Sequence, residues 1–360
     1  MIHCSLSAIN YQLSTTNYQL STIHCSTAKG GCIQAVASPS INCYNGINRK
    51  RQWQASANQH LPQKQNGKRG HPMTYEAPLY RPPSEARSLI LQLTLGCSHN
   101  QCTFCYMYKG KPYRVKSREA MWEHIAWGKA MDPGARRIFL ADGNVLGLET
   151  PLLLEILATL YREFPSLERV SVYGGPGDML EKTPEELTSL HQAGLQLVYL
   201  GVESGSDTVL QQVRKGVTSE EMITAGVRVR EAGIHLSCML ISGLGGTIHW
   251  EAHALESARV ISAINPEYLG LLTLLVEDNT PLRRQIQQGS FQLLPPEKVL
   301  AETRLLLEHL QVTDCTFRSN HPSNYLNLAG VLNQDQQRLL AEIKEAGEQG
   351  LLRPEGWRAL

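Results

Sequence analysis

The sequence predicts an α/β protein in which successive strand–helix units form a parallel sheet. Two neighbouring segments carry a Thr-x-x-Glu helix start, at Thr183 and Thr218. Each is followed by an Ala-Gly helix end, at Gly194 and Gly233, and then by an apolar strand. A threonine N-cap with glutamate three residues later is a capping box, and glycine commonly ends a helix. Repetition of this order is typical of βα units.

The first strand is predicted at residues 88–95, an apolar run that leads directly into three cysteines, Cys97, Cys102 and Cys105. Thiols separated by five and then three positions cannot all point the same way from a strand. The glycine entry and the polar residues 98–101 argue against a helix. A loop can bring the three thiols together around a metal centre.

Three thiols fit an iron–sulfur cluster better than a structural zinc ion. Zinc in such sites takes four protein ligands, and the chain has no second Cys-x-x-Cys pair. His99 would strain the chelate as a fourth ligand, because it lies two residues from Cys97. A 4Fe–4S cluster held by three thiolates leaves one iron open. A zinc site and plain buried thiols remain the alternatives.

This loop resembles the signature of the radical S-adenosylmethionine (radical SAM) enzymes. That family has a cysteine triplet after the first strand of a partial (β/α) barrel, with an aromatic residue just before the last cysteine. The resemblance implies that Cys97, Cys102 and Cys105 hold a 4Fe–4S cluster and that Phe104 lies beside the adenine of SAM. One departure is the first spacing, which has four intervening residues here and three in most of the family.

A helix is expected at residues 118–131, and the second strand, at 135–141, ends in Asp142-Gly143-Asn144. In a parallel barrel the carboxyl ends of the strands face the active side. The family carries a glycine-rich strand end here, whose backbone meets the amino group of the SAM methionine. The resemblance places Asp142, Gly143 and Asn144 in that position, although as a lone pattern they form only a turn.

The fourth strand, predicted at residues 196–200, runs into Glu203 and Ser204. A carboxylate accepts the hydrogen bonds of both adjacent ribose hydroxyls. The run resembles the ribose-contacting segment of the family, especially in the group with the anaerobic coproporphyrinogen dehydrogenases and the methylthiotransferases. Glu203 and Ser204 are therefore expected at the ribose, while Ser206 or Asp207 begins the next helix as its N-cap.

The fifth strand, at 234–241, is followed by Gly243, whose backbone lies close to the adenine if the resemblance holds. The third strand, at 168–173, ends in a glycine-rich run that either approaches a ligand or turns the chain. A sixth strand is expected at 267–275. A last strand is expected to begin near Val312, and the polar residues at its end, 316–325, either bind the substrate or form a hydrogen-bonded loop.

Residues 1–72 differ from the rest of the chain. The hexapeptide Asn-Tyr-Gln-Leu-Ser-Thr occurs at 10–15 and again at 17–22, and the segment shows neither helix nor strand periodicity. Such a composition does not assemble a core. We expect 1–72 to be a disordered or spurious N-terminal extension with Met73 as the true start, or else a genuine flexible tail. A cobalamin-binding domain would not fit in it, and it lacks the features of a secretory signal.

Composition limits the function classes. A formal net charge of +1 with mixed signs gives no support to a broad nucleic-acid surface. The sequence contains no run of 18 or more apolar residues, so it predicts no membrane span. Nine cysteines, three of them candidate metal ligands, indicate a reduced, cytoplasmic setting.

The predicted fold is a partial (β/α)6 TIM-like barrel of the radical SAM type at residues 73–290, closed by a C-terminal helical extension at 291–360. The resemblance implies reductive cleavage of SAM at the cluster, giving a 5′-deoxyadenosyl radical that abstracts hydrogen from an unknown substrate. A small molecule or peptide is preferred over RNA, and the electron donor is external, such as flavodoxin or ferredoxin. The alternative is a non-catalytic iron–sulfur or zinc-binding carrier or scaffold. No catalytic residue is assigned from the sequence.

Overall fold

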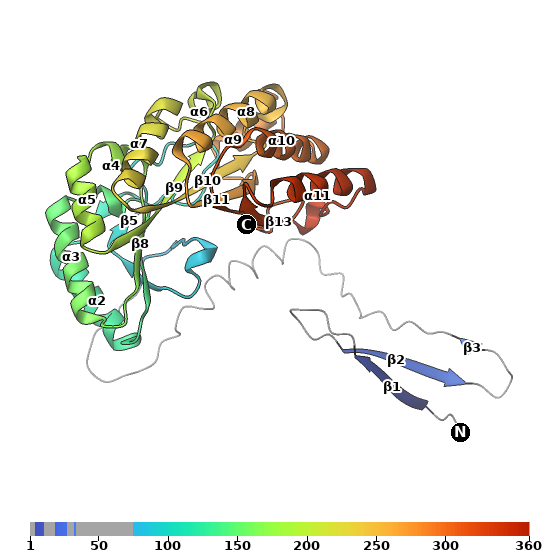
Figure 1. Cartoon of the computed structure of the whole chain (residues 1–360), viewed down its shortest axis with the longest axis horizontal. Coiled ribbons are helices and arrows are strands. Elements are labelled where there is room, and N and C mark those ends of the chain that lie inside the picture. The colour runs from blue at the N-terminus through green and yellow to red at the C-terminus, as the bar shows by residue number, and fades with distance from the viewer. Residues whose placement is uncertain (1–3, 11–18, 27–31, 34–74, 360) are drawn as a thin grey trace. The chain divides into compact units, whose positions relative to one another are not determined.

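The computed structural model describes residues 4–10, 19–26, 32–33 and 75–359, and the chain divides into two units, Met1–Pro72 and Met73–Leu360 (Figure 1). In the first unit, β1 (Cys4–Asn10) pairs antiparallel with β2 (Gln19–Ser26), and β2 pairs with β3 (Cys32–Ile33). This pairing does not test the expectation that 1–72 is a disordered or spurious N-terminal extension, which stays a prediction. The other predictions for 1–72 lie outside the described residues.

The second unit is built on one sheet with the strand order β13-β12-β11-β10-β9-β8-β7-β4 among the described residues. All neighbouring strands are parallel except the β12–β13 pair. The six predicted barrel strands are confirmed. The C-terminal extension adds two more strands as well as helices, because β12 pairs with β11. The strands are β4 (Leu89–Gln92), β7 (Arg137–Ala141), β8 (Arg169–Tyr173), β9 (Leu195–Glu203), β10 (His235–Ser242), β11 (Tyr268–Thr273), β12 (Cys315–Ser319) and β13 (Leu328–Leu332).

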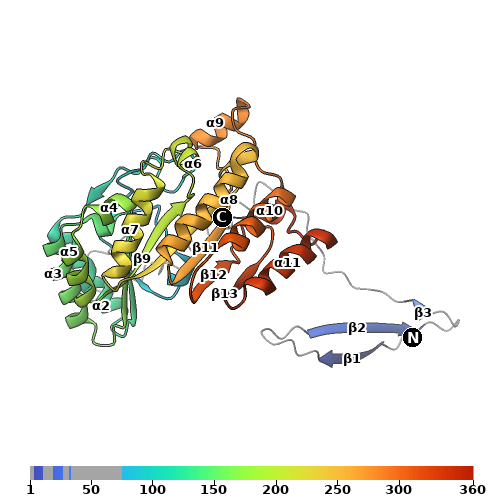
Figure 2. The same ribbon diagram turned by 45° about the horizontal axis from the view of Figure 1, so that its top comes forward.

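Helices of this unit cover the outer face of the curved sheet (Figures 1 and 2). The α-helices are α2 (Arg118–Met131), α3 (Thr150–Glu163), α4 (Pro176–Leu180), α5 (Pro184–Gln192), α6 (Asp207–Gln212), α7 (Ser219–Glu231), α8 (Gly246–Ile264), α9 (Pro281–Gln287), α10 (Pro296–His309) and α11 (Gln336–Gln349). Short 3₁₀ turns are η1 (Pro83–Glu85), η2 (Val145–Gly147) and η3 (Glu355–Trp357).

Both predicted capping boxes are present. The Thr183 hydroxyl accepts a hydrogen bond from the amide of Glu186, whose carboxylate accepts one from the amide of Thr183. The same pair of bonds joins Thr218 and Glu221. These reciprocal bonds satisfy amides that lack a partner within the helix, which is why α5 and α7 begin where the sequence predicts.

The lead-in to the sheet, residues 75–87, packs against the inner face. Tyr75 and Leu79 contact a cluster of inward side chains on β4, β7 and β9. Fully buried Glu85 accepts hydrogen bonds from the hydroxyl of Tyr199, at 2.5 Å, and from Arg169, at 2.7 Å. Arg169 is the first residue of β8, so this contact lies toward the amino ends of the strands. The carboxyl ends belong to the site described below.

Of the polar residues at 316–325, those up to Ser319 belong to β12, and the later ones form a hydrogen-bonded loop. Asn324 accepts a bond from the Thr273 hydroxyl at 2.9 Å and donates to the carbonyl of Leu271 at 2.8 Å. Arg358, near the end of the chain, donates to the carbonyls of Ser323 at 2.7 Å and Leu274 at 2.8 Å. These bonds connect the end of β11 with the C-terminal segment, and substrate binding by this loop stays an alternative.

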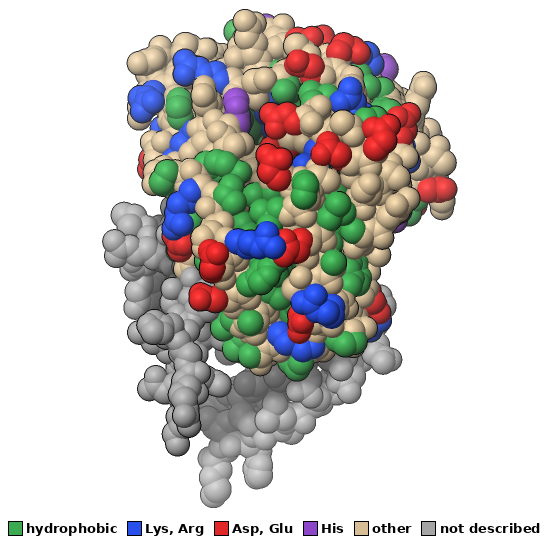
Figure 3. Space-filling view, turned by 90° about the vertical axis from the view of Figure 1, so that its left-hand side faces the viewer, with side chains coloured by type: hydrophobic (Ala, Val, Ile, Leu, Met, Phe, Trp, Pro, Cys, Tyr) green, Lys and Arg blue, Asp and Glu red, His purple; other side chains and the backbone are tan. Residues whose placement is uncertain are grey.

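Acidic, basic and hydrophobic side chains are mixed on the face seen in Figure 3, and neither charge forms a continuous surface there. Within the described ranges, we find no helix with the length and apolar character required to cross a bilayer. The cytoplasmic setting itself remains a prediction.

Candidate active site

The three cysteines lie in one loop closed at its base by a short strand pair. Strand β5 (Thr94–Leu95) pairs antiparallel with β6 (Arg114–Val115), so residues 96–113 form the loop. Gly96 has a φ of +70°, and a Cβ there would lie 2.7 Å from the carbonyl oxygen of Lys111. A side chain cannot be accommodated, so glycine lets the two sides of the loop close. All three cysteines are half-buried and free of disulfides.

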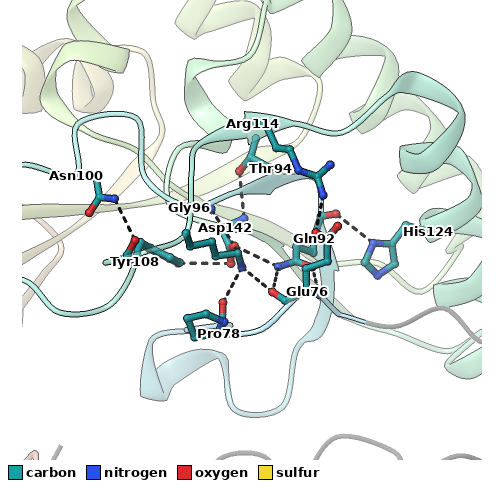
Figure 4. Close-up of polar contacts among 11 residues, drawn as sticks. Glu76, Pro78, Gln92, Thr94, Gly96, Asn100, Tyr108, Arg114, His124 and Asp142 are labelled. Atoms are coloured by element: carbon teal, nitrogen blue, oxygen red, sulfur yellow. Dashed lines mark hydrogen bonds and ion pairs between the residues drawn. The ribbon is translucent and has the colours of Figure 1, made fainter. Parts of the chain in front are cut away.

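The loop base is held by the carboxylate of Asp142, which follows β7 directly (Figure 4). This carboxylate accepts hydrogen bonds from the amide of Gly96 at 3.2 Å, from Gln92 at 3.2 Å and from the ammonium of Lys111 at 2.6 Å. Burial raises the pKa of Asp142, and the Lys111 contact opposes that shift. The side chain of Asp142 therefore organises the cysteine loop.

Gly143 and Asn144, which follow Asp142, also hydrogen-bond to the cysteine loop. The amide of Gly143 donates to the carbonyl of Gly96 at 3.1 Å, and a Cβ on Gly143 would lie 2.7 Å from that oxygen. Asn144 accepts a bond from the amide of Ser98 at 2.9 Å and donates to Asp178 at 2.5 Å. The run predicted to meet the SAM methionine thus contacts the start of the cysteine loop.

The opposite side of the loop is tied to segments much later in the chain. The amide of Thr103 donates to the carbonyl of Val213 at 2.9 Å, and the amide of Leu282 donates to the carbonyl of Thr103 at 3.0 Å. The ring of His99 lies 2.7 Å from the carbonyl of Arg214 through its Nε2 atom. His99 is therefore engaged with the backbone after α6, which argues against its role as a zinc ligand.

The environment of the thiols fits a buried cluster site. Burial raises the pKa of Cys102 to about 11, against the opposing effect of Lys215, and burial also raises the pKa of Cys105. Cys97 contributes to the rise in the pKa of both thiols. Across residues 75–359 no group of three or more Cys, His, Asp or Glu side chains converges on one ion position. A 4Fe–4S cluster binds each thiolate at a different iron, so its ligands need not converge in that way.

Glu203 ends β9 and forms an ion pair that the sequence analysis missed. Its Oε1 atom lies 3.2 Å from the Nζ atom of Lys215, and both side chains are largely buried. Burial by itself would lower the pKa of Lys215, but Glu203 and Cys102 outweigh it and raise that pKa. The site therefore holds a cation between the predicted ribose ligand and a predicted cluster ligand. The sequence signal that could have indicated Lys215 was its position shortly after the fourth strand and the helix that follows it.

Phe104 and Gly243 lie in the same part of the site. Phe104 packs on a buried apolar cluster that includes Leu244, the residue after Gly243. Gly243 has a φ of +82°, a conformation that glycine adopts without strain, and its amide donates to Glu302 at 2.7 Å. The aromatic residue of the cysteine loop and the turn after β10 thus share one apolar cluster.

Ser204 lies behind the site. Its side chain is fully buried, and its hydroxyl lies 2.8 Å from the Nδ1 atom of His253 and accepts a bond from the amide of Ser206 at 3.0 Å. Because these partners occupy the hydroxyl, we do not propose Ser204 as a ribose contact. Ser206 is the N-cap residue of α6 by position, without a side-chain capping bond.

A family model described as the radical SAM superfamily matches residues 91–257, which contain the cysteine loop, Glu203 and Gly243. The heme chaperone HemW of Bacillus subtilis is 25% identical over 214 residues, covering 56% of this chain and 54% of that protein. A tRNA-2-methylthio-N(6)-dimethylallyladenosine synthase of Dehalococcoides mccartyi is 32% identical over 150 residues, covering 39% and 34%. The chain thus spans about half of the first relative's length and about a third of the second's.

Solved structures with a similar arrangement include methylornithine synthase, with a TM-score of 0.44 and 16% identity, covering 74% of this chain and 82% of that one. The methyltransferase TsrM from Kitasatospora setae, with cobalamin and a 4Fe–4S cluster bound, has a TM-score of 0.46 and 19% identity, covering 56% and 39%. Cobalamin is a ligand of that protein, and the expectation of no cobalamin domain here stays a prediction.

The chain belongs to the radical SAM superfamily. This is a superfamily of enzymes that use a 4Fe–4S cluster and SAM, in agreement with the cofactors that the sequence predicts.

Proposed function

We propose that this chain binds a 4Fe–4S cluster through Cys97, Cys102 and Cys105, cleaves SAM reductively at its open iron, and uses the product to abstract hydrogen from a substrate. The observation that carries the proposal is the Glu203–Lys215 pair beside Cys102, which joins the thiol loop to a polar subsite at the end of β9. When bound, the cluster and SAM would supply one electron and a 5′-deoxyadenosyl radical, while the protein orients the reactants.

Each end of SAM has chain groups suited to it. Glu203 fits the two ribose hydroxyls, because its carboxylate accepts both hydrogen bonds. Lys215 fits the methionine carboxylate of SAM as a buried cation next to Cys102. Gly143 fits the methionine amino group through its backbone, since it lies against the Cys97 end of the loop. Phe104 and the turn at Gly243 fit the adenine.

The substrate side of the site is proposed around Tyr80 and Tyr106. Their ring centroids are 6.0 Å apart with the rings nearly perpendicular. Burial raises the pKa of Tyr106, and Tyr80, Glu277 and Cys105 raise it further, so these groups lie near one another. An aromatic pair with an adjacent carboxylate suits a small molecule or a peptide better than the phosphate backbone of RNA. An external donor such as flavodoxin or ferredoxin would deliver the electron.

The proposal is tested with the full chain, purified and reconstituted with iron and sulfide without oxygen. Incubation with SAM and dithionite is expected to yield 5′-deoxyadenosine, measured by chromatography. Cys102→Ala should abolish product. Cys238→Ala is the matched control, because Cys238 is fully buried in β10 and belongs to the hydrophobic core.

A brown, iron-loaded wild-type protein that forms no 5′-deoxyadenosine would contradict the proposal and favour the carrier or scaffold alternative. A colourless protein that contains zinc by elemental analysis would contradict the cluster assignment itself.

A further inference from the structure

Buried polar groups connect the two strand ends proposed to hold the nucleoside half of SAM. Behind β10, the Oε1 atom of Glu302 accepts hydrogen bonds from the Ser242 hydroxyl at 2.5 Å and from the amide of Gly243 at 2.7 Å. Behind β9, the Ser204 hydroxyl lies 2.8 Å from the Nδ1 atom of His253. The Nε2 atom of His253 is 3.8 Å from the same Oε1 atom of Glu302. At 3.8 Å the two side chains are neighbours without a hydrogen bond, so two adjacent sets of bonds, one at Glu302 and one at His253, reach the two strand ends.

Glu302 is an unusual residue to find in this position. Its side chain is 3% exposed, and its Oε2 atom has no hydrogen-bond partner within residues 75–359. Glu302 and His253 also line a cavity of about 10 Å³ together with Ser242. Burying a carboxyl group that lacks a full set of partners is costly. An apolar side chain would serve core packing better, so the bonds to Ser242 and Gly243 are the contribution that distinguishes this residue.

The two buried groups differ in their charge state near pH 7, where His253 is neutral and Glu302 titrates. Burial raises the pKa of Glu302 to about 7, although the bonds from Ser242 and Gly243 favour its charged form. Burial lowers the pKa of His253 to about 4, which keeps the ring neutral at pH 7. A neutral imidazole has one donor and one acceptor nitrogen, so it can accept from Ser204 while its other nitrogen donates.

We propose that Glu302 and His253 are positioning residues for the nucleoside half of SAM. This inference rests on the proposed function. Glu302 holds the amide of Gly243, so the peptide expected to meet the adenine keeps one orientation. His253 holds Ser204, the neighbour of the expected ribose ligand Glu203. Because Glu302 lies on α10, the C-terminal extension takes part in cofactor binding and does more than close the barrel.

The test compares affinities of the reconstituted full chain for SAM and for 5′-deoxyadenosine, measured by anaerobic equilibrium dialysis. Glu302→Leu removes both acceptor bonds and is expected to weaken both ligands by about 10-fold. Glu302→Gln keeps an acceptor oxygen for Ser242 and Gly243, so it should stay within about threefold of wild type. Glu308→Leu is the control, since Glu308 lies exposed on the same helix and pairs with Arg304 at the surface.

A second variant covers a failure of Glu302→Leu to fold. Ser242→Ala deletes one of the two bonds to Glu302 and should weaken both ligands by about threefold at unchanged iron content. If iron-loaded Glu302→Leu or, in its place, Ser242→Ala binds both ligands as tightly as wild type, the inference is overturned while the proposed function stands. A wild-type protein that binds no SAM would overturn both.

Discussion

Lys215 places a positive charge where three other assignments meet. It contacts Glu203, and its charge opposes the rise in the pKa of Cys102. Burial lowers the pKa of Lys215, but Glu203 and Cys102 raise it by more. A buried cation without these partners would be strongly disfavoured. The residue is therefore tied to the site, and its removal should affect the cofactor more than the fold.

Lys215→Met keeps the length of the side chain and removes the charge. We expect SAM affinity to fall by about 10- to 100-fold, because a hydrogen bond to a charged group contributes roughly 1.5–3 kcal/mol. Anaerobic equilibrium dialysis measures this loss. Lys344→Met on the exposed face of α11 is the control and should bind SAM like wild type. Unchanged affinity in Lys215→Met would contradict its assignment to the SAM carboxylate.

Glu302 predicts how stability depends on pH. The pKa of Glu302 is about 7 in the folded protein, and we take its ordinary value of 4.5 for the unfolded chain. Below about pH 4.5 the group is protonated in both states, so it does not change the free energy of unfolding with pH. Above that, the unfolded state ionises first, and the free energy of unfolding falls as pH rises, by about 3 kcal/mol at pH 8.

Urea unfolding of the cluster-free full chain between about pH 5 and 8 measures this effect. Wild type should lose stability over that interval relative to Glu302→Gln, which cannot ionise. Parallel pH profiles for the two proteins would show that burial does not perturb Glu302.

At the scale of elements, the cysteine loop is held by the end of β7 on one side and by the segments around Val213 and Leu282 on the other. Asp142, Gly143 and Asn144 contact the first three residues of the loop, from Gly96 to Ser98. The loop packs Phe104 on an apolar cluster and buries Tyr108, while its polar residues rely on these hydrogen bonds. Its geometry therefore depends on these attachments, which hold the thiols before any cluster is present.

Gly143→Ala tests that dependence. The added Cβ would lie 2.7 Å from the carbonyl oxygen of Gly96 and 3.3 Å from the Cα of Cys97, both backbone atoms that can move only with the loop. We expect iron content after reconstitution to fall by more than half and the unfolding free energy to drop by roughly 1–3 kcal/mol. Gly177→Ala is the control, because a Cβ there meets no atom within 4 Å. Full iron loading in Gly143→Ala would contradict this role.

At the scale of the whole molecule, the predicted helices and strands agree with the structure where the signal was local. The capping boxes at Thr183 and Thr218 start α5 and α7, and the predicted helix 118–131 has the bounds of α2. A last strand was expected to begin near Val312 and is present as β12, but β13 and the pairing of both strands with the sheet were not predicted. Pairing at a sheet edge depends on which strand has a free edge in the folded protein. The short segments 315–319 and 328–332 contain no sequence signal for that partner.

The candidate site was predictable only in part. The three cysteines and Phe104 share one short segment, so their spacing alone suggested joint chemistry. Ser204 was expected at the ribose but faces α8, because alternate residues leaving a strand point to opposite sides and the turn decides which side is which. Glu302 was missed because it is separated from Ser242 by 60 positions and carries no motif.

The sequence by itself determined the type of chemistry and the order of the βα units, since thiol spacing, capping boxes and apolar strands are properties of short segments. The tertiary structure alone decided which polar side chains hold the cysteine loop, which face the proposed cofactor, and which lie behind it. Those roles depend on contacts between residues such as Gly96 and Asp142, or Glu302 and Gly243, which are 46 and 59 positions apart. Only folding brings such residues together, because no local periodicity relates them.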